Sequence, residues 1–145
     1  MPFIPEMHTA TYAVDSVANG GTESTWFTNS QKTRIHRMNV ISEAAIAAHS
    51  SAVLKVELLT GSTVIGKVTN DSDEADTTAV TGTPGIDTAL YGAKTARNID
   101  FTQAGANSDG SYENAADAAL EIKTSNDTGG TITDVMISIE YTVSD

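Results

Sequence analysis

Large apolar side chains occupy every second position between Val135 and Val143, near the end of the chain. A period of two is typical of a β-strand with one buried face, because successive side chains leave opposite faces of the pleated backbone. The composition favours strands throughout: isoleucine and valine together number 21 against 5 leucines, and threonine occupies 21 of the 145 positions. Since β-branched residues are enriched in strands, the sequence predicts an all-β protein.

Other strands are predicted where β-favouring stretches end at turn residues. They cover His8 to Val14, Thr25 to Thr28, Arg34 to Ile41, Ala52 to Leu59, Thr63 to Thr69, Asn98 to Thr102 and Ala119 to Thr124. In the third of these, Met38 and Val40 are expected on the face opposite Ile35 and Ile41. Thr60-Gly61-Ser62 predicts a hairpin between the fourth and fifth. Only Ser42 to His49 favours a helix, of about two turns.

Seven or eight short strands without alternating helices predict a single-domain, two-sheet β-sandwich of jelly-roll or immunoglobulin-like type. Residues 7–145 are expected to form this domain. Residues 1–6 are expected to form an extended N-terminal arm, because Pro2 and Pro5 lack the N–H group that a central strand requires. Asn70 to Asp87 is rich in acidic residues and threonine, which predicts a polar surface loop.

The predicted core is small for the length of the chain. Leucine, isoleucine, valine and phenylalanine account for 29 of the 145 residues, and the net charge of −11 makes the folded chain repel itself. We therefore expect burial against a neighbouring subunit to supply part of the stability.

Neither nucleic acid nor a membrane is expected as a partner. All of the excess acidity lies beyond Thr69, while Lys32 to Arg37 contains three of the eight basic residues. Nucleic acid binding calls for a net basic surface, so no nucleic acid partner is expected. No signal peptide or apolar run of membrane-spanning length is found, which predicts a soluble protein made in the cytoplasm, with no membrane partner.

No motif in the sequence predicts a catalytic residue, a cofactor or a metal site. Gly61 to Lys67 matches a phosphate-binding loop until Val68, where that loop needs a hydroxyl group. The acidic run Asp71 to Asp76 lacks the spacing of a calcium loop. His8, His36 and His49 are scattered, and a catalytic triad built from distant loops would leave no local signature.

Two glycosylation tripeptides also occur, at Asn70-Asp71-Ser72 and Asn126-Asp127-Thr128. In a chain so rich in serine and threonine, such matches arise by chance.

Trp26 and Phe27 allow two interpretations. Lectin-like sandwiches stack sugar rings on exposed aromatic side chains, so a carbohydrate site is one of them. The other is that Trp26 fills the core or contacts another subunit, since large aromatic side chains dominate both settings.

Several stretches together resemble the small β-sandwich structural proteins of tailed-phage virions, and especially capsid decoration (cement) proteins. They are the proline-containing N-terminal arm, Ala52 to Leu59 followed by Gly61 and Val64-Ile65, Asn114 to Ile122, and Ile137 to Val143. The resemblance implies a jelly-roll-like protein, often trimeric, that sits on the outer shell at junctions between hexamers of the major capsid protein. The family has no catalytic residues.

The expectation is therefore a non-enzymatic virion structural protein, made in the host cytoplasm and bound to the outer capsid surface. Its partners would be the major capsid protein and copies of itself, as a homotrimer. The predicted interface residues are Pro2, Phe3, Ile4, Pro5, Trp26, Phe27, Arg34 and Arg37. A head-tail adaptor or tail structural protein, and a carbohydrate-binding β-sandwich module, remain as alternatives.

Overall fold

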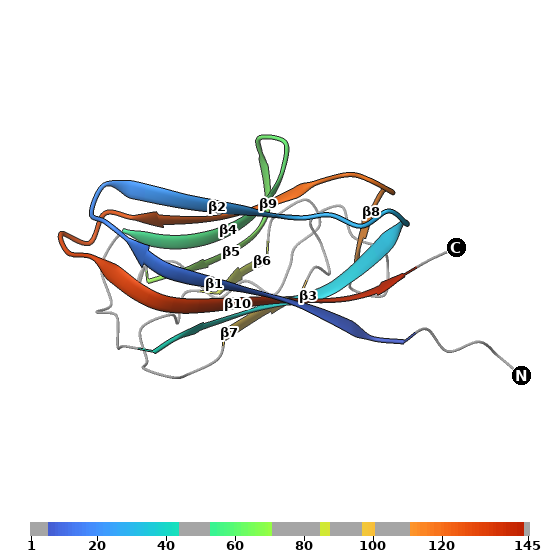
Figure 1. Cartoon of the computed structure of the whole chain (residues 1–145), viewed down its shortest axis with the longest axis horizontal. Coiled ribbons are helices and arrows are strands. Elements are labelled where there is room, and N and C mark those ends of the chain that lie inside the picture. The colour runs from blue at the N-terminus through green and yellow to red at the C-terminus, as the bar shows by residue number, and fades with distance from the viewer. Residues whose placement is uncertain (1–5, 44–52, 71–84, 88–96, 101–110, 144–145) are drawn as a thin grey trace, which may run out of the picture.

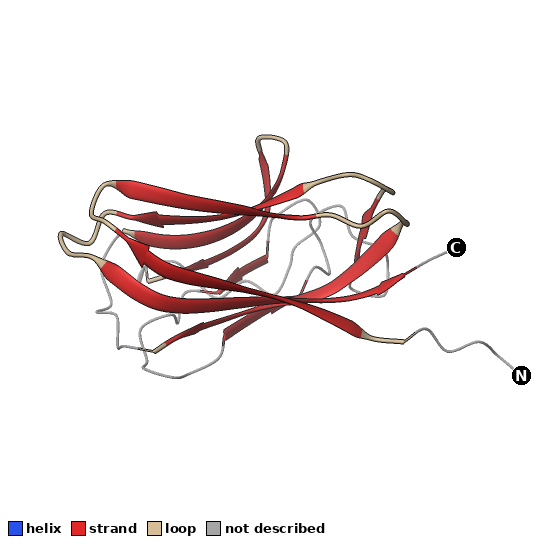
Figure 2. Cartoon of the chain, in the orientation of Figure 1, coloured by secondary structure: helices blue, strands red, loops and turns tan. Residues whose placement is uncertain are grey.

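The computed structural model describes residues 6–43, 53–70, 85–87, 97–100 and 111–143, and for 85–87 and 97–100 it describes the backbone alone. The described residues form ten strands arranged in two five-stranded sheets (Figures 1 and 2). The prediction of an all-β, two-sheet sandwich is confirmed.

The first sheet has the order β1-β10-β3-β7, and β8 also pairs with β3. Its strands are β1 (His8–Val17), β3 (Thr33–Ser42), β7 (Arg97–Asp100), β8 (Tyr112–Asn114) and β10 (Ile132–Val143). The second sheet has the order β2-β9-β4-β5-β6. It consists of β2 (Gly21–Phe27), β4 (Leu54–Thr60), β5 (Thr63–Thr69), β6 (Gly85–Asp87) and β9 (Leu120–Asn126). Described strand pairs are antiparallel except β5 with β6.

The chain crosses from the first sheet to the second in the turn between β1 and β2. Gly20 has φ +78°, a conformation that L side chains rarely adopt, and the Gly21 amide donates a hydrogen bond to the carbonyl of Ala18. Among the described residues β1 pairs only with β10 and β2 pairs only with β9, so both are edge strands.

The core lies between the two sheets and consists mainly of β-branched and leucine side chains from both. On β10 the predicted alternation is confirmed: Val135, Ile137 and Ile139 are buried. Tyr141 continues this face, and its ring meets the ring of Phe27 edge-to-face with centroids 5.0 Å apart. The contact joins the two sheets, since Phe27 lies in β2.

A β-bulge in β3 corrects the predicted facing of that strand. Arg37 pairs with Glu140 whereas Ile35 pairs with Tyr141, so His36 is an extra residue on β3. The extra residue reverses the alternation, and Ile35 therefore shares the buried face with Met38 and Val40 instead of opposing them. Of the two isoleucines predicted to oppose that pair, only Ile41 does so.

The predicted hairpin is confirmed as β4 and β5. Gly61 opens its two-residue turn with φ +59°, which fits a type II′ turn with glycine at its first central position. Leu58 pairs with Gly66 and Leu59 with Val64, so Ile65 is an extra residue on β5 and forms a β-bulge there. Lys67 lies within β5, paired in register with Glu57, so the stretch that matched a phosphate-binding loop is a strand.

Several predicted boundaries change. Asn70, assigned to the polar loop, is buried and accepts a hydrogen bond from the Leu54 amide at 2.9 Å. β6 falls at the end of that loop, and β8 was not predicted. Ser42 ends β3, and residues 44–49 of the predicted helix lie outside the described residues, as does the acidic run 71–76.

Candidate functional site

The two aromatic residues predicted as an interface pair lie on opposite faces of β2. Phe27 is 2% exposed and packs into the core, whereas Trp26 is 56% exposed on the outer face of the second sheet. The alternation of the strand causes this separation. The expectation that Phe27 contacts a partner is therefore corrected, because a buried side chain is inaccessible to another protein. Trp26 does not fill the core and is accessible.

Arg34 and Arg37 lie on the outer face of the first sheet, in β3. Glu140 of β10 faces Arg37, with 3.6 Å between Nε and Oε2, and Arg34 pairs in register with Glu113 of β8. Lys32, just before β3, also reaches Glu113, at 3.7 Å. The predicted basic strand is therefore accompanied by carboxylates from its neighbours. These pairs are partly exposed and contribute little to stability.

Pro2, Phe3, Ile4 and Pro5 lie outside the described residues. The structure thus places Trp26, Arg34 and Arg37 on the surface, with Trp26 on a different sheet from the two arginines.

A groove that the sequence did not predict crosses the outer face of the first sheet. Met136 is 48% exposed at its centre, with Ala13 of β1 on one side and Ile41 of β3 on the other, both in register with it. Asp15, Glu43 and Asp134 also line the groove, whose volume is about 300 Å³. One signal was present in the sequence. Met136 lies between Val135 and Ile137, whose side chains are expected to face the core, so strand alternation sends the large apolar side chain of Met136 outward.

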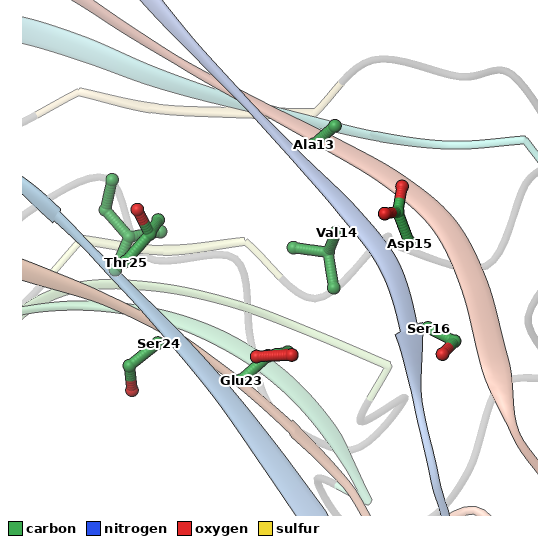
Figure 3. Close-up of a pocket in the computed structure, with 8 residues that line it drawn as sticks. Ala13, Val14, Asp15, Ser16, Glu23, Ser24 and Thr25 are labelled. Carbon is green, nitrogen blue, oxygen red and sulfur yellow. The ribbon is translucent and has the colours of Figure 1, made fainter.

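A second groove, of about 220 Å³, lies between edge strands β1 and β2. Figure 3 shows Val14 reaching from β1 and Glu23 from β2 into the space between these strands. Ser16, Ser24 and Thr25 also line it. Its described lining offers hydroxyl and carboxylate oxygens and includes no histidine, cysteine or lysine.

The described histidines lie beside β10 and not in either groove. His36 Nε2 is 2.9 Å from Thr142 Oγ1, and the ring of His8 stacks on Tyr141 with centroids 5.4 Å apart. Among the residues that the structure describes, no three histidine, cysteine or acidic side chains are placed to hold a metal ion.

Tyr12 lies on the inward face of β1, packed against the core. Burial, with a smaller contribution from nearby Tyr141, raises the pKa of its phenol above the ordinary 10.0.

Neither glycosylation tripeptide offers an accessible asparagine. Asn126 is 1% exposed, and its amide nitrogen donates to the carbonyls of Val17 and Gly130 at 2.8 and 2.7 Å. Asn70 is equally buried. Both asparagine side chains make hydrogen bonds to the backbone inside the folded domain.

No family model and no curated protein matches the chain. A solved structure described as "Crystal Structure of the STIV MCP", a viral major capsid protein, is similar at 13% identity with a TM-score of 0.30. The match covers 96% of this chain and 48% of that one, so the chain spans about half the length of that protein. None of the described segments forms a helix with the length and hydropathy of a membrane span.

Proposed function

We propose that this chain is a non-enzymatic structural protein of a virion that binds the outer surface of the capsid shell and holds neighbouring major capsid protein subunits together. It does so, in this proposal, as a passive clip whose contacts lie on its outer sheet faces and its N-terminal arm. Copies of the chain would associate on the shell, as a homotrimer.

The observation that carries the proposal is the position of two exposed apolar side chains. Trp26 projects from the outer face of the second sheet, and Met136 projects from the outer face of the first. Exposed tryptophan and methionine are enriched where proteins meet each other. Because these two side chains lie on opposite faces of one sandwich, they suit a protein that contacts a neighbour on each side.

The charge distribution supports the same role. Arg37 lies next to Glu140 and Lys32 next to Glu113, which leaves no large single-sign basic face on the described part of the first sheet. Such a surface fits protein contacts better than nucleic acid. In this proposal Pro2, Phe3, Ile4 and Pro5 dock on an adjacent subunit and add apolar burial that the small core lacks.

Co-expression with the major capsid protein of the same genome tests the proposal. Purified shells should carry the chain in a fixed stoichiometry, and calorimetry should show that decorated shells melt at a higher temperature than bare ones. Shells that carry none of the chain under these conditions contradict the proposal. Density confined to one ring at the portal vertex would assign the chain to the head-tail adaptors.

The exposure of Trp26 also keeps a carbohydrate-binding module as a second candidate. An outward indole on a β-sheet, with Glu121 opposite it in β9, offers a stacking surface and a hydrogen-bond acceptor for a sugar. Trp26 is the sole tryptophan, so glycan binding would change the intrinsic fluorescence directly. Saturable quenching of the Trp26 fluorescence by a glycan would favour this candidate.

A further inference from the structure

We propose that Asn19 is a site of spontaneous deamidation which the folded chain keeps closed, so that the residue reacts only when the turn between β1 and β2 opens. Water is the only co-reactant. The contacts that control the reaction lie within one chain, so the site is independent of the proposed role on a capsid.

Asn19 and Gly20 form the only Asn-Gly dipeptide in the sequence. In such a pair the backbone nitrogen of glycine can attack the side-chain carbon Cγ of asparagine, because glycine has no Cβ to hinder the approach. The nitrogen gives up its proton and forms the new N–C bond, while the side-chain amide group takes up a proton and leaves as ammonia. The product is a five-membered succinimide ring. Water then opens the ring at either carbonyl and leaves aspartate or isoaspartate.

The β1–β2 turn exposes Asn19 to water but holds its backbone in an unreactive conformation. The Gly21 amide donates to the Ala18 carbonyl at 2.9 Å and Gly20 has φ +78°, which fits a type II turn with Asn19 at its first central position. The ring closes only when the Gly20 nitrogen eclipses Cβ of Asn19. From a type II turn, the Cα–C bond of Asn19 must rotate by about 120° to reach that alignment.

Two further hydrogen bonds oppose this rotation. The Gly20 amide, which carries the attacking nitrogen, donates to the Asn126 carbonyl at 2.6 Å, and Asn19 Oδ1 accepts from the Gly129 amide at 2.8 Å. Both partners lie at the turn between β9 and β10, beside the β1–β2 turn (Figure 1). The Gly129 amide polarises the carbonyl under attack, but the Gly20 nitrogen cannot reach it while its proton is held by Asn126. Reaction therefore waits for local opening.

The two products should affect the fold differently. Aspartate at position 19 keeps the native backbone and an oxygen that can accept from the Gly129 amide. Isoaspartate carries the main chain through the former side chain, so it lengthens by a methylene group the turn in which the chain crosses between the sheets. Chains with isoaspartate at this position should therefore unfold at a lower urea concentration than chains with aspartate.

Peptide mapping by mass spectrometry tests the site in the native chain, both folded and unfolded by urea, in the same mildly alkaline buffer. In the unfolded chain Asn19 should react faster than any other asparagine, because every other asparagine is followed by a residue with a side chain. In the folded chain the rate at Asn19 should fall at least about tenfold, since the turn must open first.

A matched pair of glycine variants distinguishes opening of the turn from unfolding of the whole domain. Gly129 and Gly61 have φ of +90° and +59°, and a Cβ at either would meet no described atom within 4 Å, so alanine adds backbone strain without a clash. In the folded chain Gly129→Ala should raise the rate at Asn19 about fivefold or more, because it strains the turn that holds this residue. Gly61→Ala strains the β4–β5 hairpin and should leave the rate unchanged. Circular dichroism checks that both variants are folded.

Equal rates at Asn19 in the folded and unfolded native chain overturn the inference, and so does an unfolded chain in which another asparagine reacts faster. Equal acceleration by the two glycine variants would show that Asn19 reacts through global unfolding, which also overturns it. A native rate in folded Gly129→Ala would show that the β9–β10 turn does not protect the site, with the same consequence.

Discussion

The amide nitrogen of Asn126 in β9 donates a 2.8 Å hydrogen bond to the carbonyl of Val17, the last residue of β1, and so ties the two sheets together at one end. The same nitrogen reaches the Gly130 carbonyl, and Oδ1 accepts from the amide and the hydroxyl of Thr128. One buried side chain thus orders the β9–β10 turn and fastens it to the other sheet.

Asn126→Ala should lower the free energy of unfolding by about 3 kcal/mol, because it removes several buried hydrogen bonds and leaves the Val17 carbonyl without this donor. Urea denaturation measures the change. Asn19→Ala is the matched control. Among the described residues, Asn19 Oδ1 accepts one hydrogen bond, from the Gly129 amide at an exposed site, so this substitution should cost about 1 kcal/mol or less. Similar losses for the two variants would show that Asn126 has no special role.

Thr124→Val should stabilise the protein by about 1 kcal/mol. Thr124 is fully buried on the inward face of β9, and its hydroxyl has no hydrogen-bond partner among the described residues. Valine has nearly the same shape and avoids the desolvation of that hydroxyl. Thermal unfolding of this variant and of Thr11→Val, an exposed site on β1, provides the comparison. A melting temperature lowered by Thr124→Val alone would reveal a partner for the hydroxyl.

Deletion of His36 should be tolerated, at a cost of about 2 kcal/mol or less. His36 is the extra residue of the β3 bulge, so its removal restores regular pairing with β10 and keeps Ile35 on the buried face. Deletion of Asn39, from the regular part of the same strand, turns one half of β3 inside out and should abolish folding. Circular dichroism and proton NMR dispersion distinguish the two outcomes. Two folded or two unfolded variants would contradict this view of the bulge.

Stability should decline above about pH 10 partly because of Tyr12. The pKa of its phenol is raised in the folded chain, so above the unfolded value of 10.0 the folded state holds more protons than the unfolded state. The stabilising contribution is complete below that pH and is lost as the pH rises through the folded pKa. Urea midpoints from pH 8 to 12 should fall less steeply for Tyr12→Phe than for the native chain. Parallel curves would contradict the assignment.

The architecture was accessible from the sequence where alternation and turn chemistry agree. The inward row of β10 and the Gly61 hairpin were predicted because each depends on local rules. The face on which Ile35 lies was not predicted, because a bulge adds one residue without any local sequence signature. The burial of apolar side chains then determines which residues of β3 face the core. Asn70 was missed for a related reason: its burial depends on a hydrogen bond to Leu54, sixteen residues away.

The candidate surfaces were only partly predictable. Trp26 and Phe27 form one aromatic pair in the sequence, but strand alternation sends one outward and one inward. The groove around Met136 joins residues from three strands that are distant in the chain, so strand alternation could place Met136 on the outer face but no spacing rule could place its neighbours beside it.

The most direct test of the clip mechanism compares the occupancy of shells by three variants: Trp26→Ser, Met136→Ser and the two combined. Both sites are exposed, so each variant should unfold at nearly the native urea concentration. Copies of the chain per shell, counted by cryo-electron microscopy, should fall for each single variant and nearly vanish for the double variant. Native occupancy in the double variant would contradict the account.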